Sequence, residues 1–98
     1  IRLLQPATLE AASRVASRGP DLVVLVETCF GLGFSLPPML GAGVGPRAFG
    51  HPGAGGSLAF ADPEPNVAFA YVTNRMRFDP AGDPRVTGLV RALYDCTR

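Results

Sequence analysis

The first part of the chain has the spacing of a helix with a narrow apolar stripe. Its apolar residues recur at helical intervals, namely Leu9, Ala12, Val15 and Ala16. Pro6 precedes them and suits the first position of a helix, where its missing N–H costs nothing. Gly19 and Pro20 follow, and such a pair is typical of a helix end. We therefore expect a helix that begins at Pro6, is stopped by Gly19 and Pro20, and lies on the surface.

Two stretches with strand patterns come next. Residues 22–26 form a continuous apolar run, consistent with a strand buried on both faces, and residues 27–28 interrupt it. Residues 29–36 alternate bulky apolar side chains with small ones, which is the period of a strand. The bare positions at Gly31 and Gly33 indicate that another backbone packs closely against that face.

Residues 37–47 are rich in Gly and Pro and form a predicted loop that also holds Met39, Leu40 and Val44. Such an apolar but irregular stretch is either a flap over a site or a plain connector that tucks its apolar side chains inward. The two interpretations carry equal weight.

The second half of the chain predicts a hairpin followed by a helix. Residues 58–61 and 67–74 have strand patterns, and residues 62–66 form a turn with two prolines and an asparagine suited to fixed or positive φ. Both faces of the second strand are largely apolar, so we expect helices to cover one of them. Asp83 and Pro84 suit the N-cap and first position of the final helix. The apolar stripe of this helix consists of Val86, Leu89, Val90 and Leu93.

These elements predict a layered α/β protein of the α+β kind, with antiparallel strands flanked by N- and C-terminal helices. Of its 98 residues, 47% are hydrophobic and 17% are charged, which excludes a disordered chain. No apolar run reaches the roughly 18 residues that a membrane-spanning helix requires. The net charge of +1 gives no reason to expect a nucleic acid or an anionic membrane as a partner.

The inventory of reactive side chains excludes several mechanisms. All nine basic residues are arginines, so no mechanism can take a lysine from this chain. His51 is the one histidine, and without clustered carboxylates it predicts no metal site. Cys29 and Cys96 lack the spacing of a zinc site and the density of a disulfide scaffold, so we expect two small buried or partly buried thiols. Ser57 has no local base. We expect neither a metal ion nor a cofactor.

The N-terminal residues carry no recognisable targeting signal. The first residue is Ile rather than Met, and no charged segment followed by an apolar one comes after it. A signal peptide is therefore not expected, and a cytoplasmic location is slightly favoured. The Ile at position 1 also suggests a chain cut from a longer one.

Residues 49–57 form the segment best suited to a ligand. A P-loop is excluded because no lysine follows the last glycine. The spacing of Gly41, Gly43 and Gly45 fails the dinucleotide fingerprint, and the later glycines lead into a strand rather than a helix. Taken alone, a glycine-rich run that enters a strand is more often a bulge or tight turn than a site.

Four sequence blocks span nearly the whole chain: residues 30–34 (FGLGF), 49–57 (FGHPGAGGS), 60–64 (FADPE) and 71–76 (YVTNRM). Their order and spacing resemble the C-terminal part of the serine β-lactamase-related hydrolases, the group of class C β-lactamases, penicillin-binding proteins and esterases. The resemblance implies a β-lactamase/transpeptidase-like fold, in which residues 1–98 are the C-terminal part of one incomplete domain.

The family builds its site from three motifs, and the resemblance places only the third in this chain. The Ser-x-x-Lys motif is absent because there is no lysine. Tyr71 and Tyr94 do not form the family's Tyr-x-Asn motif, and both follow the third motif instead of preceding it. That third motif, Lys-Thr-Gly or His-x-Gly, corresponds to His51-Pro52-Gly53.

The resemblance also implies roles for the residues of this third motif. His51 takes the place of the family's lysine and donates to the catalytic hydroxyl network or to a substrate carboxylate. Gly53 and Gly55 let a substrate approach the backbone, and the N–H of Ala54 is one of two donors to the oxyanion. Because a histidine anchors anions less firmly than a lysine, esters are favoured over carboxylate-bearing β-lactams. The alternative is that His51 merely packs in its strand.

Two functions remain open from the sequence. In the first, the chain contributes the His-x-Gly oxyanion strand to a serine hydrolase acting on a small ester or amide, its Ser nucleophile lies outside this chain, and the isolated chain is inactive. In the second, it is a non-catalytic fragment or pseudoenzyme that acts only through association. Apolar strand faces predict exposed apolar surface, so the isolated chain is expected to be oligomeric or poorly folded.

Overall fold

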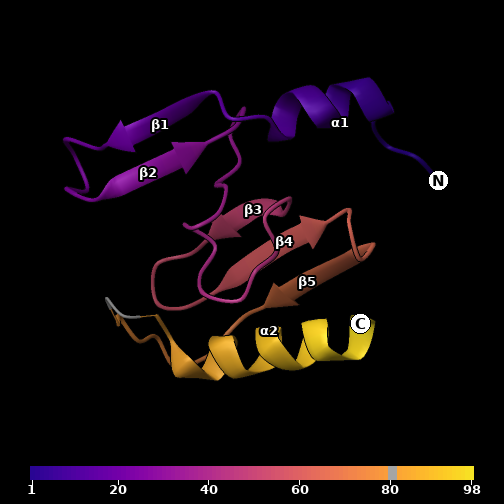
Figure 1. Cartoon of the computed structure of the whole chain (residues 1–98). Coiled ribbons are helices and arrows are strands. Elements are labelled where there is room, and N and C mark those ends of the chain that lie inside the picture. The colour runs from indigo at the N-terminus through magenta and orange to yellow at the C-terminus, as the bar shows by residue number, and fades with distance from the viewer. Residues whose placement is uncertain (80–81) are drawn as a thin grey trace.

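The computed structural model describes residues 1–79 and 82–98, which form two helices and two small antiparallel sheets (Figure 1). The elements in chain order are α1 (Pro6–Ser13), β1 (Ser17–Pro20), β2 (Glu27–Phe30), β3 (Phe49–Pro52), β4 (Leu58–Asp62), β5 (Val67–Tyr71) and α2 (Pro84–Thr97). The α+β class and the antiparallel strands expected from the sequence are confirmed.

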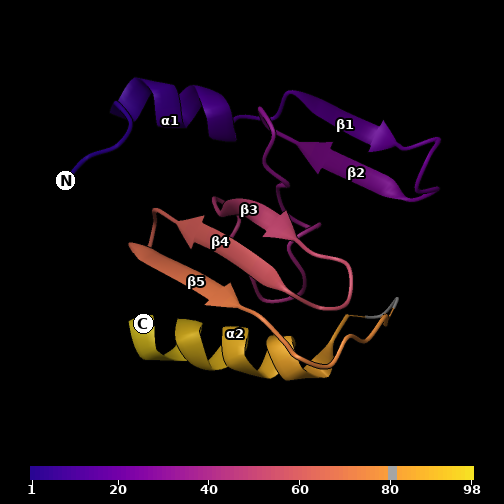
Figure 2. The same cartoon turned by 180° about the vertical axis from the view of Figure 1, so that it is seen from behind.

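The two sheets lie one above the other, and α2 runs along the far side of the larger one (Figures 1 and 2). One sheet pairs β1 with β2, and the other has the order β3-β4-β5. Ser35 connects the sheets, because it forms isolated bridges with both Phe30 and Gly50. In the larger sheet, His51 lies opposite Ala59, and Phe60 lies opposite Phe69.

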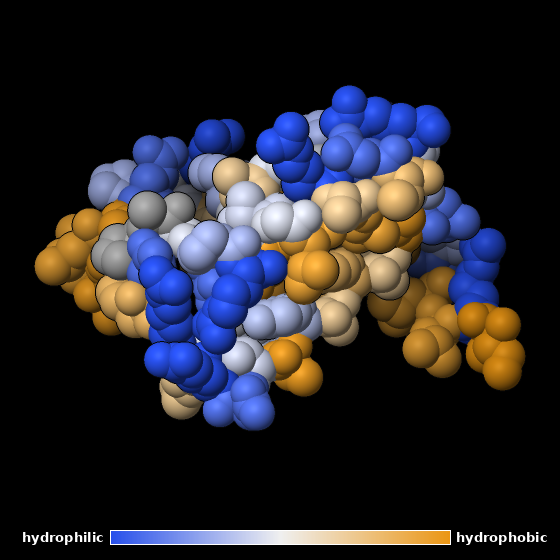
Figure 3. Space-filling view, turned by 90° about the horizontal axis from the view of Figure 1, so that it is seen from below, coloured by the Kyte–Doolittle hydropathy of each residue, from blue (hydrophilic) through white to orange (hydrophobic). Residues whose placement is uncertain are grey.

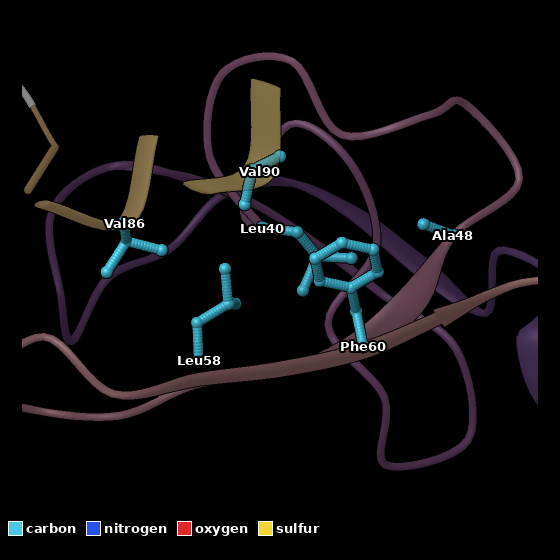
Figure 4. Close-up of a cluster of buried hydrophobic side chains, with 6 residues drawn as sticks. All are labelled: Leu40, Ala48, Leu58, Phe60, Val86 and Val90. Carbon is cyan, nitrogen blue, oxygen red and sulfur yellow. The ribbon is translucent and has the colours of Figure 1, made fainter. Parts of the chain in front are cut away.

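The hydrophobic core lies between β4 and α2. Its buried members are Leu40, Ala48, Leu58, Phe60, Val86 and Val90. Figure 4 shows Leu58 and Phe60 pointing from β4 toward Val86 and Val90 on α2. Phe60 also contacts two partly buried rings, with its centroid 5.4 Å from that of Phe69 and 6.3 Å from that of Tyr94. One face of the sheet is therefore covered by a helix, as expected.

The final helix begins where its sequence predicts. The Asp83 side chain accepts a hydrogen bond from the N–H of Arg85 at 3.0 Å, and Pro84 occupies the first turn. Val86 and Val90 are buried, but Leu89 is 48% exposed. The predicted four-residue stripe is thus wrong at Leu89, because one sheet covers only a narrow arc of the helix.

The first helix is shorter than predicted. It ends at Ser13, and Arg14 is already extended, with φ −74° and ψ 147°. Gly19 and Pro20 do not stop it, because they lie in β1 and pair with β2. The N–H of Ala16 donates to the carbonyl of Phe30 at 2.8 Å, so strand pairing has replaced another helical turn. No residue of α1 is buried, which confirms its surface position.

The apolar run of residues 22–26 is not a strand. It forms the turn between β1 and β2, and Leu22 and Val23 are 89% and 88% exposed. The prediction is wrong because the Asp21 carboxylate accepts hydrogen bonds from the N–H groups of Val23 and Val24, at 2.8 and 3.0 Å. These bonds commit the backbone to a turn, and the side chains of residues 22–26 lie exposed on the part of the chain that the structure describes.

The strand predicted over residues 29–36 is also shorter. Residues 27–28, expected to interrupt the apolar run of residues 22–26, begin β2. The chain turns after Phe30, where the N–H of Gly31 donates to the carbonyl of Phe34 at 2.9 Å. A Cβ at Gly31 would collide with the backbone carbonyl of Ala12, which confirms close packing there. Gly33 has open space around it and a φ of 84°, so it serves the turn instead.

The remaining predictions between residues 37 and 74 agree closely with the structure. Residues 37–47 form a loop without strands or helices, and Leu40 is buried within it, as a connector with inward apolar side chains requires. The predicted hairpin is β4 and β5, although β5 ends at Tyr71 instead of Asn74. Asn66 has a φ of 57° in the turn between them.

These elements leave apolar surface open at both ends of the molecule and in a patch between them (Figure 3). Its most exposed residues include Ile1, Leu3, Leu22, Val23, Leu25 and Phe78. Among the described residues, no helix is long and apolar enough to cross a membrane.

Candidate functional site

The strand that carries the candidate motif lies between two backbones. Along one side, β3 pairs with β4. Along the other, Gly50 exchanges two hydrogen bonds with Ser35, at 2.7 and 3.1 Å. A Cβ at Gly50 would lie 2.6 Å from the Cα of Phe60, so only glycine allows this approach. The strand is therefore fixed just before the motif begins.

His51 lies on the face of the sheet opposite α2. It is exposed and pairs with exposed Ala59, whereas the neighbouring Leu58 and Phe60 point into the core. Its Nδ1 lies 2.6 Å from the carbonyl oxygen of Pro52. Since a carbonyl only accepts, Nδ1 carries the proton in this contact, and among residues 1–79 and 82–98 no hydrogen bond is found for Nε2, which accepts in that tautomer.

The motif ends in a tight turn, residues 53–57, which we call the glycine turn. The N–H of Gly53 donates to the carbonyl of Ser57 at 2.7 Å, and the N–H of Gly56 donates to that of Gly53 at 3.2 Å. Gly55 and Gly56 have φ values of 90° and 112°, which other residues rarely adopt. Within residues 1–79 and 82–98, no acceptor is found for the N–H of Ala54.

A cavity of about 470 Å³ opens on the α2 side of the same turn. It is bounded by residues 38–42, by the glycine turn and by the first half of α2. Pro52, Gly53 and Gly56 line it, but His51 and Ala54 do not. The structure thus brings the four predicted site residues, His51, Gly53, Ala54 and Gly55, into one short segment, with His51 on the opposite face from this cavity.

An ion pair at the start of α2 lies beside the glycine turn. The Arg85 Nε is 2.9 Å from the Asp83 Oδ1, and Nη1 donates to the carbonyl of Arg75 at 2.9 Å and to the Thr73 Oγ1 at 3.3 Å. The hydrogen bond from Arg85 lowers the pKa of Asp83 to about 2, and the same pairing raises the pKa of Arg85. Arg85 lies outside the apolar stripe of the final helix, and its only signal in the sequence is its position two residues after the N-cap.

A second polar network ties the connecting loop to α2. The Tyr94 hydroxyl donates to the Asp62 Oδ2 at 2.7 Å and accepts from the N–H of Gly45 at 2.9 Å. Asp62 is only 1% exposed. Burial, with the bond to Asp62, raises the pKa of Tyr94 to about 12. Tyr94 is therefore a structural residue in this chain.

The described residues contain no cluster of three or more His, Cys, Asp or Glu side chains that could hold a metal ion. Both cysteines are free thiols. Cys29 is buried, as expected, but Cys96 is exposed, because it lies on the outer side of α2 near its end.

Comparison with known proteins identifies the family that this chain matches. The sequence model of the Beta-lactamase family matches residues 1–92. Over 57 residues, 58% of this chain, the chain is 46% identical to an esterase/beta-lactamase, LipL, from Mycobacterium tuberculosis (strain ATCC 25618 / H37Rv), of which this match covers 13%.

Solved structures share the fold over almost the whole chain. EstA from Arthrobacter nitroguajacolicus Rue61a is 33% identical over 97% of this chain, with a TM-score of 0.81. A penicillin-binding protein homolog from Caulobacter crescentus is 43% identical over 95%, with a TM-score of 0.83. A family VIII carboxylesterase is 34% identical over 97%, with a TM-score of 0.88. The chain spans only 25%, 25% and 26% of these three structures.

Proposed function

Because this chain belongs to the beta-lactamase family, we propose that it is the C-terminal part of a serine hydrolase domain that cleaves small esters or amides through an acylated serine. The nucleophilic serine and its lysine lie outside this chain, since the chain contains no lysine. Residues 1–98 then form one incomplete domain, which supplies a wall of the site.

The observation that carries this proposal is the N–H of Ala54. It lies in the glycine turn directly after His51-Pro52-Gly53, and Ala54 is exposed. Within the described residues its N–H has no acceptor. Acyl transfer builds negative charge on a carbonyl oxygen, and a fixed backbone N–H aimed at that oxygen lowers the barrier by about 3 kcal/mol. We assign the N–H of Ala54 to this role, with Gly53 and Gly55 leaving room for the substrate.

His51 contributes an exposed ring on the face of the sheet opposite α2. The contact of Nδ1 with the carbonyl of Pro52 leaves Nε2 exposed to accept or relay a proton. A neutral ring is a poor anchor for a substrate carboxylate, which favours esters over carboxylate-bearing β-lactams. The name of one structural relative, the family VIII carboxylesterase, supports this preference.

A second candidate function is association without catalysis. It is favoured by exposed apolar side chains in the turn between β1 and β2 and at the N-terminal residues. Among them are Ile1, Leu22 and Val23, which are 121%, 89% and 88% exposed. A pseudoenzyme of this kind has no nucleophile in any longer form of the protein.

The two functions are separated by assaying the intact protein and the 98-residue chain with a chromogenic short-chain ester and a chromogenic cephalosporin. We expect the intact protein to hydrolyse the ester faster than the cephalosporin, and the 98-residue chain to hydrolyse neither. A fluorophosphonate should label the intact protein only where a Ser-x-x-Lys motif precedes this segment. Turnover by the 98-residue chain would contradict a nucleophile outside it.

His51→Ala in the intact protein should lower kcat for the ester by at least about tenfold, because a general acid or base is lost. The matched control is Glu64→Gln, an exposed residue of the turn after β4, which should retain the original rate. An unchanged rate in the His51 variant would remove that residue from the site and leave it as a strand residue that packs.

A further inference from the structure

We propose that Arg85 is a positioning residue for the glycine turn, and that it holds the N–H of Ala54 in place without touching the substrate. The inference rests on the proposed oxyanion role of that N–H. Arg85 acts through two routes, one through the segment after β5 and one through Asp83, and the two routes meet the turn at adjacent glycines.

The first route reaches Gly55. The N–H of Arg77 donates to the carbonyl of Gly55 at 2.9 Å. Met76 packs directly against the same residue, because a Cβ at Gly55 would lie 2.7 Å from the Met76 Cε. Gly55 is therefore in contact with residues 76–77 along both its carbonyl and its α-carbon, and its position depends on theirs.

Residues 73–75 hold that segment, and Arg85 holds them. Its Nη1 donates to the carbonyl of Arg75 at 2.9 Å and to the Thr73 Oγ1 at 3.3 Å. The Thr73 Oγ1 in turn accepts from the N–H of Arg75 at 3.0 Å. A planar guanidinium presents several donors in a fixed fork, so it can bond both acceptors together. The residues immediately before Met76 are thereby attached to the first turn of α2.

The second route reaches Gly56 through Asp83. The Asp83 side chain is 8% exposed, and its Oδ2 lies 2.5 Å from the Arg85 Nη2. A Cβ at Gly56 would lie 2.7 Å from that same Oδ2 and 3.4 Å from the Arg85 Nη2. The ion pair is therefore packed against the α-carbon of Gly56. It also caps α2, since Asp83 accepts from the N–H of Arg85.

The glycine turn needs such outside support because little within it restricts the backbone. It has two internal hydrogen bonds, from Gly53 and from Gly56. Glycines have more accessible backbone conformations than other residues. An error of about 1 Å in the placement of a catalytic group can reduce the rate on the order of a hundredfold. A residue that fixes Gly55 and Gly56 together also fixes the N–H of Ala54 that precedes them.

The test replaces Arg85 in the intact protein with Met, which keeps the length of the side chain and removes its donors. Arg91→Met is the matched control, because Arg91 is an exposed arginine on the same helix. The kinetic readout is kcat and KM for the ester, expressed per active site titrated with a fluorophosphonate. The structural readout is hydrogen exchange at the amides of Arg77 and Gly56. The first donates to the carbonyl of Gly55 and the second to the carbonyl of Gly53, so both report on the glycine turn.

We expect Arg85→Met to lower kcat per titrated site by about tenfold with KM changed by less than about twofold, because the interaction is made in the transition state. The exchange of both amides should quicken. Arg85→Lys should recover part of the rate, since an ammonium group can still reach one acceptor. Arg91→Met should change neither readout. A purely structural role for Arg85 would lower the number of titrated sites and leave kcat per site unchanged, which would overturn the proposal.

Two further outcomes keep this test separate from the test of the proposed function. If Arg85→Met does not fold, Thr73→Val removes one acceptor of the same fork and should produce a smaller change of the same sign; unchanged kinetics and exchange in that variant would refute the proposal. If the wild-type protein hydrolyses no ester, the proposed function fails, and the exchange readout alone decides whether Arg85 holds the glycine turn.

Discussion

Two regions of the molecule are held together by different forces. The hairpin region, residues 1–36, contains the pair of strands β1 and β2, and the sheet region, residues 37–98, contains β3, β4, β5 and α2. Every member of the main hydrophobic core belongs to the sheet region. In the described hairpin region only Thr28, Cys29, Gly31, Ser35 and Leu36 are buried, and the large apolar side chains of its turn lie open to solvent. Its order comes from backbone pairing between β1 and β2, with added bonds such as that from the N–H of Leu32 to the carbonyl of Ala12 at 2.9 Å.

The difference shows that regular backbone pairing and stability are separate properties. A typical hydrogen bond adds only about 1 kcal/mol, because the unfolded chain bonds to water instead. Burial of one large apolar side chain adds about 1.5–3 kcal/mol. We therefore expect the sheet region to open only with global unfolding and the hairpin region to open more easily.

The largest effect should follow from Phe60→Ala in β4. Phe60 is 4% exposed and contacts the rings of Phe69 and Tyr94, so its removal should lower the free energy of opening of the sheet region by about 3–5 kcal/mol. Hydrogen exchange at the amides of β4 and β5 measures this quantity. Phe78→Ala is the matched control, since Phe78 is 87% exposed. Equal losses in the two variants would contradict a core centred on β4.

A smaller effect should follow from Tyr94→Phe, which leaves the buried Asp62 carboxylate without its hydroxyl partner at a cost of about 1–3 kcal/mol. The wild-type pKa of about 12 lies above the ordinary value of 10.0, so the folded state favours the neutral phenol. Its contribution is complete below about pH 10 and is lost as the pH rises toward 12. Thermal melting between pH 9 and 12 should therefore fall more steeply in wild type than in the variant. Parallel curves would show that Tyr94 plays no part in the alkaline transition.

The smallest effect on stability should follow from Leu22→Ser with Val23→Ser in the hairpin turn. Neither side chain is covered, so each change should alter the free energy of unfolding by less than about 0.5 kcal/mol. The same pair should reduce self-association of the 98-residue chain, measured by sedimentation, because it removes exposed apolar surface. Val72→Ser, at an 84% exposed position beyond β5, is the control. A large loss of stability in the pair would mean that the turn is covered in the folded protein.

The sequence predicts the sheet region better than the hairpin region for the same physical reason. In β4 and α2 the apolar residues recur with the period of the element that forms. Local signals such as Asp83-Pro84 agree with that pattern, so the pattern predicts the packing. Residues 22–26 have an equally apolar pattern, but the hydrogen bonds from Val23 and Val24 to Asp21 decide their conformation. The end of α1 depends on pairing with β2, which no local pattern encodes.

The candidate site was predictable only as far as it is contiguous in sequence. His51-Pro52-Gly53 and the glycine turn are recognisable because they follow one another within residues 49–57, one of the four blocks that resemble the family. The fork that Arg85 makes with Thr73 and Arg75 joins residues far apart along the chain, and the contact of Asp83 with Gly56 needs the backbone to bring them together. Spacing alone carries no signal for contacts of this kind.

Each of the two regions carries one free thiol, and the rate at which that thiol reacts with a dye reports on its region. Cys96 is exposed on α2, so a thiol-reactive dye modifies it at a rate set by the reagent. Cys29 is 3% exposed in β2, and its sulfur becomes reachable only while the hairpin is open. A single labelling time course therefore has two phases, and the slow one counts the opening events of the hairpin region directly.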